Sequence, residues 1–482
     1  MIFTEEKEMK IKLGLGKLKM ENVARYCGGE LYDYSGEEGV SVSYVCTDSR
    51  EADADTMFVA TRGERVDGHD YIISAIDRGC KCILCEYVPT DIAGRAVAFV
   101  TVENSIDAFA LTAKGYRAEK RLKTVAITGS VGKTTTKELT AAILGRSENL
   151  YATSGNFNSV IGMPMSLMEA PIDRDTAVFE MGMSGFGEIH SMSVTAAPDV
   201  AMVVNIGSSH LEYLKTRENI ARAKLEIADG LREGGYLLLN GDEPLLQGKK
   251  GDAKYNVLYL GIENKDTSDA YADNIEVSES GTAFDLCFDG KKYASLKIKP
   301  IGRQFVYNAM FASVASLLMG CDEQTVREGL ISYTPGGIRQ NVKNVNGITL
   351  VADCYNAAPE SMRGAIDTLC AINISGKRIA VVGDMRELGE GSDTMHRDIG
   401  KYIAEKGIDL LFTLGESGKL IADGAKASGM SEKNIFSETD TENAESLCQA
   451  LESKMNEGDG VLIKASRGVR LERVIERLFK EN

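Results

Sequence analysis

The segment that most constrains the fold is Lys123–Glu138, which reads KTVAITGSVGKTTTKE. It begins with a short run of apolar and β-branched residues, Thr124–Ile127, which predicts a buried strand. The turn after this strand and the start of the next helix contain Gly129, Ser130, Val131, Gly132, Lys133, Thr134 and Thr135. A strand that runs through a glycine turn into a helix N-terminus gathers backbone N–H groups around an anion. Lys133 would add a cation for β- and γ-phosphates and the Thr134 hydroxyl can bind Mg²⁺, so the segment predicts a site for a nucleoside triphosphate.

The spacing of this loop leaves one alternative open. The usual motif is G-x-x-x-x-G-K-[ST], but Ile127 stands where its first glycine would be, and the loop is the shorter G-x-x-G-K-T-T. A glycine turn unrelated to phosphate is the competing interpretation. The Lys-Thr pair directly after a strand favours the phosphate site.

The length and composition of the chain indicate three globular domains. At 482 residues the chain is too long for one hydrophobic core. Strands alternate with helical patterns, which predicts α/β domains with mostly parallel sheets. We expect a small α/β domain over residues 1–120, a central ATP-binding domain with a phosphate loop over 121–335, and a Rossmann-like domain over 336–482. In the third domain we expect strands at Ile348–Ala352, Arg378–Val382, Leu410–Leu414 and Gly460–Lys464.

Charge and cysteine usage exclude some classes of protein. The formal net charge of -16 argues against sequence-independent nucleic-acid binding, which needs a basic face. No apolar run approaches the ~18 residues that span a membrane, and no secretory signal is visible at the N-terminus, where Met9 could be the true start. The cluster of Cys80, Cys82 and Cys85 could bind a metal, but no second ligand pair follows, and structural thiols are the better interpretation. We therefore expect a cytoplasmic protein. The sequence is silent on oligomeric state, and a monomer is the expectation.

Two loops of the N-terminal domain offer groups that bind phosphate. The first follows the predicted strand Val40–Cys46 and the second follows Thr56–Ala60. They contain Ser49, Arg50, Arg62 and Asp67. Arginine forks at strand ends can hold phosphate or pyrophosphate. Solvated loops without a ligand are the alternative.

Two side chains of the central domain directly follow predicted strands. Glu180 follows Thr176–Phe179, and His210 comes shortly after Val200–Asn205. Because ligands of parallel sheets bind beyond the carboxyl ends of the strands, both side chains should face the phosphate loop. There they could bind a metal ion or support its ligands. A packing role for a lone histidine is the alternative.

Lys224 is predicted to lie on the apolar face of a helix that Thr216 caps and that continues to about Arg232. Ile220 and Ile227 belong to the same stripe, at helical spacing from the lysine. Burial would lower the pKa of the amine and leave it neutral. A neutral amine can take up CO₂ to form a carbamate, which would be an oxygen ligand for a metal. A lysine that snorkels to solvent fits the spacing at least as well.

Further candidates come later in the chain. Asn308 precedes the apolar segment Ala309–Met319 and is predicted to cap a helix there, with a base contact as an additional role. Arg339 could reach back to a nucleotide. The polar loop after the first strand of the third domain suggests a second substrate face and carries Asp353, Tyr355 and Asn356.

Together these motifs resemble the Mur ligase family over nearly the whole chain. TGSVGKTTTKE is similar to the phosphate loop of the family, and GNFNSVIGMP, with Asn156 and Asn158, is similar to its asparagine-rich segment. EMGMSGFGEI, NIGSSHLEYL and ARAKLEI resemble the segments that hold a metal-site Glu, His and carbamylated Lys. These roles would fall on Glu180, His210 and Lys224.

Three motifs select a branch of the family. DCYNAAPESM, GDMRELG and KASRGVRLERV are similar to the branch that adds D-alanyl-D-alanine, and TDSREADADTMFVATRGERVDGHDYI is similar to its UDP-sugar site. The resemblance implies an ATP-dependent ligase that joins D-alanyl-D-alanine to UDP-N-acetylmuramoyl-tripeptide through an acyl phosphate, in peptidoglycan precursor synthesis.

The resemblance also implies roles for the candidate residues. ATP would contact the phosphate loop, Asn308, Arg339 and Asp353. Mg²⁺ would be held by Thr134, Glu180, His210 and the carbamate of Lys224. The UDP-sugar peptide would contact Ser49, Arg50, Arg62, Asp67, Asn156 and Asn158. D-Alanyl-D-alanine would contact Tyr355, Asn356 and Ser361. Gln304 stands where the family commonly has His, which leaves the adenine contacts open.

Two other functions remain open. One is another ligase of the superfamily, either a tripeptide-forming Mur ligase or a folylpolyglutamate synthase, and the UDP-site-like first domain argues against the synthase. The other is a phosphate-loop NTPase that acts as a switch or binding module. Such an NTPase gives no reason for a lysine on the apolar face of a helix.

Overall fold

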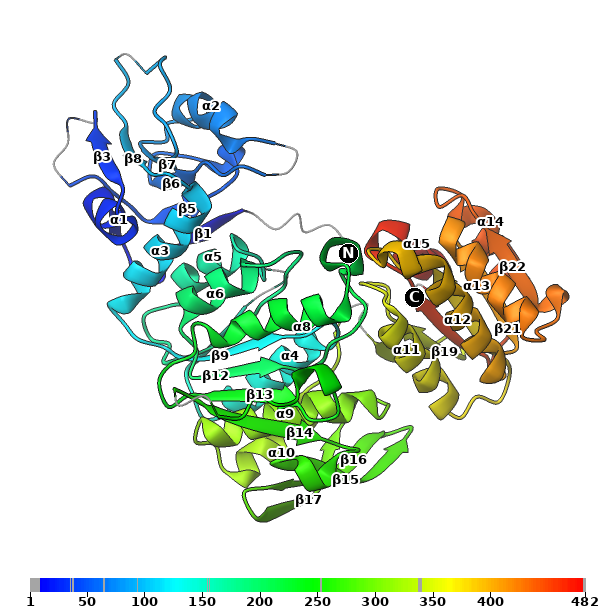
Figure 1. Cartoon of the computed structure of the whole chain (residues 1–482). Coiled ribbons are helices and arrows are strands. Elements are labelled where there is room, and N and C mark those ends of the chain that lie inside the picture. Colours follow the sequence, from blue (N-terminus) through cyan, green and yellow to red (C-terminus); the bar gives the residue numbers. More distant parts are fainter. Residues whose placement is uncertain are drawn as a thin grey trace.

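The computed structural model describes residues 9–479 except 35, 37, 38, 64, 65, 93, 154, 156, 252, 253 and 337–339. It contains three successive α/β units, each built on its own sheet (Figure 1). The predicted class, α/β with largely parallel sheets in three domains, is confirmed. We refer to the units as N-terminal, central and C-terminal.

The N-terminal unit has a six-stranded sheet in the order β1-β5-β6-β7-β8-β3. Its four middle strands are parallel and its two edge strands are antiparallel to them. The strands are β1 (Lys10–Lys12), β3 (Glu30–Asp33), β5 (Tyr44–Cys46), β6 (Thr56–Val59), β7 (Cys82–Cys85) and β8 (Ala98–Thr101). The helices are α1 (Met20–Cys27), α2 (Ile72–Asp77) and α3 (Ser105–Ala118). The strand predicted at Val40–Cys46 is divided, because β4 (Ser41–Val42) pairs with β2 (Leu18–Lys19) in a separate small sheet.

The central unit has a nine-stranded sheet in the order β10-β11-β9-β12-β13-β14-β15-β16-β17. It is parallel as far as β15 and ends in an antiparallel meander. The strands are β9 (Lys123–Thr128), β10 (Leu150–Ala152), β11 (Thr176–Glu180), β12 (Val200–Val203), β13 (Tyr236–Asn240), β14 (Asn256–Gly261), β15 (Ala270–Ser278), β16 (Gly281–Phe288) and β17 (Lys291–Ile298). The helices are α4 (Lys133–Leu144), α5 (Gly162–Glu169), α6 (Glu188–Ala196), α7 (Leu211–Leu214), α8 (Arg217–Leu225), α9 (Gln304–Leu318) and α10 (Glu323–Ser332).

Two hydrophobic cores cover the faces of the central sheet. Alternation along β9 sends Val125 and Ile127 into the core under α4, α9 and α10, and Ala126 into the core on the other face. This second core continues into the N-terminal unit, where α3 packs against α5 and α6. The Gly14 N–H donates to the Met168 carbonyl at 2.8 Å. The N-terminal unit is therefore packed firmly on the central one.

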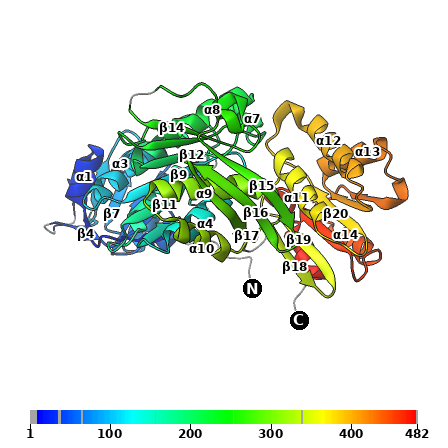
Figure 2. The same cartoon turned by 90° about the horizontal axis from the view of Figure 1, so that it is seen from below.

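The C-terminal unit has a six-stranded sheet in the order β18-β19-β23-β20-β21-β22, parallel except for β18. The strands are β18 (Asn341–Val345), β19 (Ile348–Ala352), β20 (Arg378–Gly383), β21 (Leu410–Leu414), β22 (Ile435–Glu438) and β23 (Gly460–Lys464). The helices are α11 (Pro359–Ala371), α12 (Ser392–Glu405), α13 (Glu416–Ala427), α14 (Ala444–Glu452) and α15 (Glu472–Leu478). All four predicted strands are present, and the edge strands β18 and β22 were not predicted. In Figures 1 and 2 this unit lies beside the meander β15–β17, where the Asn373 N–H donates to Glu279 at 3.0 Å.

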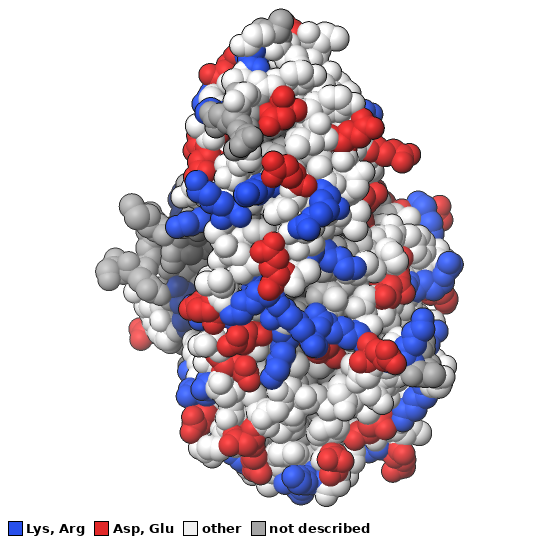
Figure 3. All heavy atoms as spheres, turned by 90° about the vertical axis from the view of Figure 1, so that its left-hand side faces the viewer, with Lys and Arg blue, Asp and Glu red and all other residues white. Residues whose placement is uncertain are grey.

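The surface carries charges of both signs. In Figure 3, Lys and Arg gather across the middle of one face, with Asp and Glu among them and around them. Among the helices that the structure describes, none combines the length and apolar composition needed to cross a bilayer.

Candidate active site

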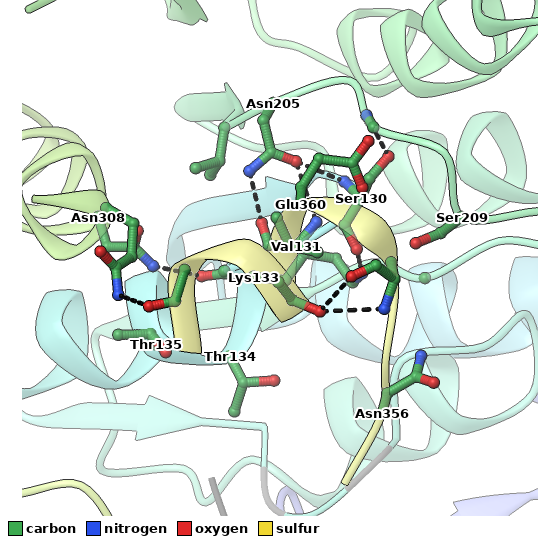
Figure 4. Close-up of a pocket in the computed structure, with 18 of the residues that line it drawn as sticks. Ser130, Val131, Lys133, Thr134, Thr135, Asn205, Ser209, Asn308, Asn356 and Glu360 are labelled. Carbon is green, nitrogen blue, oxygen red and sulfur yellow. Dashed lines mark hydrogen bonds between the residues drawn. The ribbon is translucent and has the colours of Figure 1, made fainter. Parts of the chain in front are cut away.

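A cavity of about 660 Å³ lies between the central and C-terminal units (Figure 4). Its walls are the phosphate loop, the ends of β11 and β12, the first turns of α9, and the loop from β19 into α11. It is therefore at the carboxyl ends of strands of two sheets, where α/β folds bind ligands. The predicted residues that line it are Ser130, Val131, Gly132, Lys133, Thr134, Thr135, Asn158, Glu180, His210, Asn308, Asp353, Tyr355, Asn356 and Ser361. Asn156 and Arg339 lie outside the described residues.

The phosphate loop joins β9 to α4 through Gly132, whose φ of 80° lies in the left-handed region. Asn308 Nδ2 donates to the Gly132 carbonyl at 3.0 Å, and a Cβ on this glycine would lie 2.7 Å from that nitrogen. The predicted helix cap at Asn308 is wrong, because α9 already begins at Gln304. Asn308 therefore lies in the second turn of α9, and its side chain holds the loop.

Asn205 also holds this loop, and the sequence analysis missed it. Its Oδ1 accepts the N–H groups of Ser130 and Val131 at 3.0 and 2.9 Å, and its Nδ2 donates to the Val131 carbonyl at 2.8 Å (Figure 4). One side chain thus satisfies three backbone groups that would otherwise need a ligand or water. The signal was its place two residues beyond β12, the same strand-end rule that identified Glu180.

The cation and hydroxyl predicted from the loop lie next to a carboxylate. Lys133 Nζ donates to the Gly129 carbonyl at 2.8 Å. Thr134 Oγ1 donates to Glu180 Oε2, and Asn158 Nδ2 donates to Glu180 Oε1, both at 2.8 Å. A hydroxyl and a carboxylate on a phosphate loop are ligands that suit Mg²⁺. Within the described ranges no cluster of three His, Cys, Asp or Glu side chains could hold a metal by itself.

His210 points across the cavity toward the C-terminal unit. Its Nδ1 lies 2.6 Å from Glu387 Oε2, and this contact lowers the pKa of the Glu387 carboxyl. Next to it, the Glu212 N–H donates to the Glu387 carbonyl at 3.1 Å. His210 therefore links two units in this arrangement, and its role at a metal stays a prediction.

Lys224 lies in α8 with 1% of its surface exposed, so it does not snorkel to solvent. The Thr216 side chain caps α8 as predicted, by accepting the Asn219 N–H at 3.2 Å, but the α-helix ends at Leu225, earlier than expected. Burial lowers the pKa of Lys224 well below its usual value, and the nearby Lys133 lowers it further. No acceptor among the described residues forms a hydrogen bond with its amine. The Lys224 amine is thus buried close to Lys133 of the phosphate loop, in surroundings that favour its neutral form.

The wall of the cavity that the C-terminal unit supplies contains a buried ion pair. Lys464, at the end of β23, lies 2.6 Å from Asp353, which directly follows the neighbouring strand β19. Lys464 also donates to the Asn356 carbonyl at 2.7 Å. The Arg467 guanidinium lies 5.8 Å from the ring centroid of Tyr355. The carboxylate predicted to face a nucleotide is therefore already paired with a cation.

Ser361 and Gln304, which the sequence analysis also singled out, form hydrogen bonds that stabilise the fold. The Ser361 hydroxyl bonds the Ala358 N–H at 3.0 Å and caps α11. Gln304 Nε2 donates to the Gly364 carbonyl at 3.2 Å and to Thr368 Oγ1 at 3.0 Å. Gln304 thus joins α9 to α11 at the edge of the cavity.

Four of the residues predicted for the UDP-sugar peptide lie on the N-terminal unit and do not line this cavity, whereas Asn158 does line it. Ser49 and Arg50 follow β5, and Arg62 follows the parallel neighbour β6. Arg62 Nε lies 2.8 Å from Glu86 and 3.6 Å from Asp67. The four side chains therefore belong to one edge of that sheet, away from the cavity.

Comparisons with known proteins agree with this geometry. The Mur ligase middle domain matches residues 127–316, the Mur ligase glutamate ligase domain matches 339–467, and the Mur ligase family catalytic domain matches 41–117. The chain is 36% identical over 467 residues to UDP-N-acetylmuramoyl-tripeptide–D-alanyl-D-alanine ligase of Bacillus subtilis, which covers 96% of this chain and 99% of that protein.

Solved structures give the same result. MurF from Acinetobacter baumannii is similar with a TM-score of 0.87 and 27% identity, covering 97% of this chain and all (100%) of that one. MurF ligase from Thermotoga maritima in complex with ADP gives a TM-score of 0.78 and 30% identity, covering 90% and 96% of the two chains. The likeness in sequence and structure extends over all three units, and the chain belongs to the Mur ligase family.

Proposed function

We infer that the protein is an ATP-dependent ligase that adds D-alanyl-D-alanine to UDP-N-acetylmuramoyl-tripeptide and so forms the pentapeptide of the peptidoglycan precursor. The observation that carries this inference is the full-length likeness to ligases of that name. The cavity supports it, because the phosphate loop and the loop from β19 into α11, which is predicted to bind a second substrate, face the same space. Both substrates are small molecules, and ATP and UDP-linked precursors place the reaction in the cytoplasm.

The phosphate loop would hold ATP through its backbone N–H groups and Lys133. Thr134 and Glu180 would hold Mg²⁺, which when bound neutralises phosphate charge. Asn308 holds the loop in shape, and Asp353 would contact the nucleotide from the acceptor side. Arg339 is a further candidate for the phosphates.

Lys224 would act as a carbamate. Its burial, its lowered pKa and the lack of a hydrogen-bond acceptor among the described residues support a neutral amine that reacts with CO₂. The carbamate would supply oxygen ligands close to the phosphate loop, with His210 beside it. This would turn a buried group that costs stability into part of the metal site.

The reaction would proceed in two steps. The terminal carboxylate of the tripeptide attacks the γ-phosphate of ATP, forming an acyl phosphate and releasing ADP. The amine of D-alanyl-D-alanine then attacks the acyl carbon, loses a proton, and phosphate leaves. Phosphoryl transfer between two anions depends mainly on positioning and charge neutralisation, which the loop and Lys133 would supply together with the Mg²⁺ that Thr134 and Glu180 would hold. Closure of the C-terminal unit over the cavity would keep water from the acyl phosphate.

Binding of the other substrates would involve the three units together. The UDP moiety would lie on the N-terminal unit, at Ser49, Arg50, Arg62 and Asp67, and the sugar peptide would extend toward Asn156 and Asn158. The dipeptide would lie beside Tyr355, Asn356 and Ser361. We expect a monomer, since one chain carries all these groups.

Phosphate release from ATP tests the function. We expect release only with both UDP-N-acetylmuramoyl-tripeptide and D-alanyl-D-alanine present. A Lys224→Ala variant should be inactive and should be partly rescued by short carboxylic acids, which replace the carbamate. Release that is indifferent to both substrates would instead identify an NTPase switch, and release with a glutamate acceptor would identify another ligase of the superfamily.

A further inference from the structure

One of the carboxylates that line the cavity has, among the described residues, only one hydrogen-bond donor beside it, and that donor is not a cation. The acidic side chains that line the cavity are Glu180, Glu188, Asp242, Glu243, Asp353 and Glu360. Glu180 accepts hydrogen bonds from one hydroxyl and one amide N–H, and the next four accept from two or more N–H groups or from a cation. Glu360 has a single bond within the described ranges, from the neutral hydroxyl of Ser208 to its Oε1 at 2.8 Å.

Glu360 reaches from the first turn of α11 to the beginning of the phosphate loop. The place where a Cβ on Gly207 would lie is 3.0 Å from Glu360 Oε2 and 3.1 Å from Ser130 Cβ. A glycine at 207 therefore lets the carboxylate approach the loop without crowding. Figure 4 shows Glu360 beside Ser130 and Val131. The Glu360 carboxylate thus lies between the phosphate loop and the loop from β19 into α11.

A carboxylate in this position is unfavourable beside bound phosphates unless a cation comes between them. Lys464 is already paired with Asp353, and Lys133 bonds the Gly129 carbonyl within its own loop. Both lysines that line the cavity therefore have other partners, and the proposed Mg²⁺ would lie at Thr134 and Glu180, so we consider the charges of the substrates. Of the proposed substrates, D-alanyl-D-alanine carries an ammonium group.

We propose that Glu360 binds the ammonium group of the acceptor dipeptide and holds its nitrogen near the acyl carbon formed at the phosphate loop, which the nitrogen attacks after it has lost one proton to water. Ser208 holds Oε1 of Glu360 and leaves Oε2, on the Gly207 side, for the ammonium. This role rests on the proposed function and adds a residue that selects acceptors with a free, charged amino terminus.

The test compares steady-state kinetics of the full-length wild type, Glu360→Gln and Glu360→Asp. Glu416→Gln is the matched control, because Glu416 is also an exposed glutamate in the first turn of a helix of the same unit, and it does not line the cavity. We expect Glu360→Gln to raise the KM for D-alanyl-D-alanine by roughly tenfold or more, since a charge-assisted hydrogen bond is lost. The KM values for ATP and the UDP substrate should stay within about twofold, and Glu360→Asp should lie between wild type and Glu360→Gln.

A neutral acceptor analogue separates charge recognition from a structural effect. D-lactoyl-D-alanine carries a hydroxyl in place of the ammonium, and its inhibition constant should not change in Glu360→Gln. An unchanged dipeptide KM in Glu360→Gln would overturn the proposal, as would an equal loss for dipeptide and analogue. A lower KM for ATP with an unchanged KM for the dipeptide would also overturn it. That result would mean that the Glu360 carboxylate weakens the binding of phosphate at the loop. If the wild type releases phosphate without the dipeptide, it is the proposed function that fails.

Discussion

Replacing Lys464 by Met would remove the cation of a buried ion pair and leave a charge behind. The side chains of Lys464 and Asp353 are 2% and 9% exposed, and their charged atoms lie 2.6 Å apart. Met retains most of the apolar stem, so the change acts mainly on the charge. The Asn356 carbonyl would also lose its 2.7 Å hydrogen bond from Lys464.

We expect this variant to destabilise the C-terminal unit by about 3–5 kcal/mol, the cost of an uncompensated buried charge. Adding Asp353→Leu removes the second charge. The double variant should recover most of that loss, because a well-packed apolar pair is often as stable as a buried ion pair. The recovery should concern stability alone, since Asp353 is also a predicted nucleotide contact.

Hydrogen exchange of the full-length protein, followed by mass spectrometry, measures this effect locally. A global unfolding curve would mix three units. In Lys464→Met, peptides over β19 and β23 should exchange about a hundredfold to several thousandfold faster if they open as one unit, at about 1.4 kcal/mol per tenfold. Peptides over β9 serve as the internal control and should not change. Wild-type protection in the single variant, or a double variant as poorly protected as the single, would refute the reasoning.

Three further predictions concern other parts of the molecule. Asn205→Ala removes the clamp on the phosphate loop and should lower kcat/KM for ATP by roughly tenfold to a hundredfold, with the dipeptide KM unchanged in phosphate-release assays. Burial raises the pKa of Cys85 to about 12, so its thiol is protonated at pH 8. In the native protein iodoacetamide should modify the partly exposed Cys287, and it should modify Cys85 only after unfolding, as mass spectrometry would show. A Cβ on Gly400 would lie 1.9 Å from the Ile421 carbonyl, so Gly400→Ala should force α12 and α13 apart, cost about 1–3 kcal/mol and lower the melting temperature.

The elements that the sequence predicted well are those whose pattern is local. The strand β9 and the start of α4 follow from an apolar run, a glycine turn and Lys133, all within one short segment. Glu180 was found because a strand end in a parallel sheet fixes where the next side chain points. Helical spacing placed Lys224 on the apolar face of its helix but left burial and snorkelling open, and the structure shows that the side chain is buried.

The features that the sequence did not predict depend on contacts between distant segments. The start of α9 was placed too late, since Asn308 looks like a cap until its bond to Gly132, far away in the chain, is known. The partners of His210 and Gln304 lie in the C-terminal unit. No local pattern encodes how two separately folded units meet, so those pairings could not be read from the sequence.

The contacts that cross the cavity suggest why the C-terminal unit can close and open. Ser208 to Glu360, His210 to Glu387 and Gln304 to Gly364 are polar pairs rather than parts of a continuous core. Polar contacts of this kind contribute about 0.5–1.5 kcal/mol each, and somewhat more when charged, so together they hold the units by a few kcal/mol. Ile301 of the central unit packs into a hydrophobic core of the C-terminal unit, but the core that the N-terminal and central units share contains many residues of both. We therefore expect substrate binding to shift the position of the C-terminal unit and to leave the N-terminal unit in place. The proposed reaction needs this movement, because the dipeptide must enter the cavity and the product must leave it.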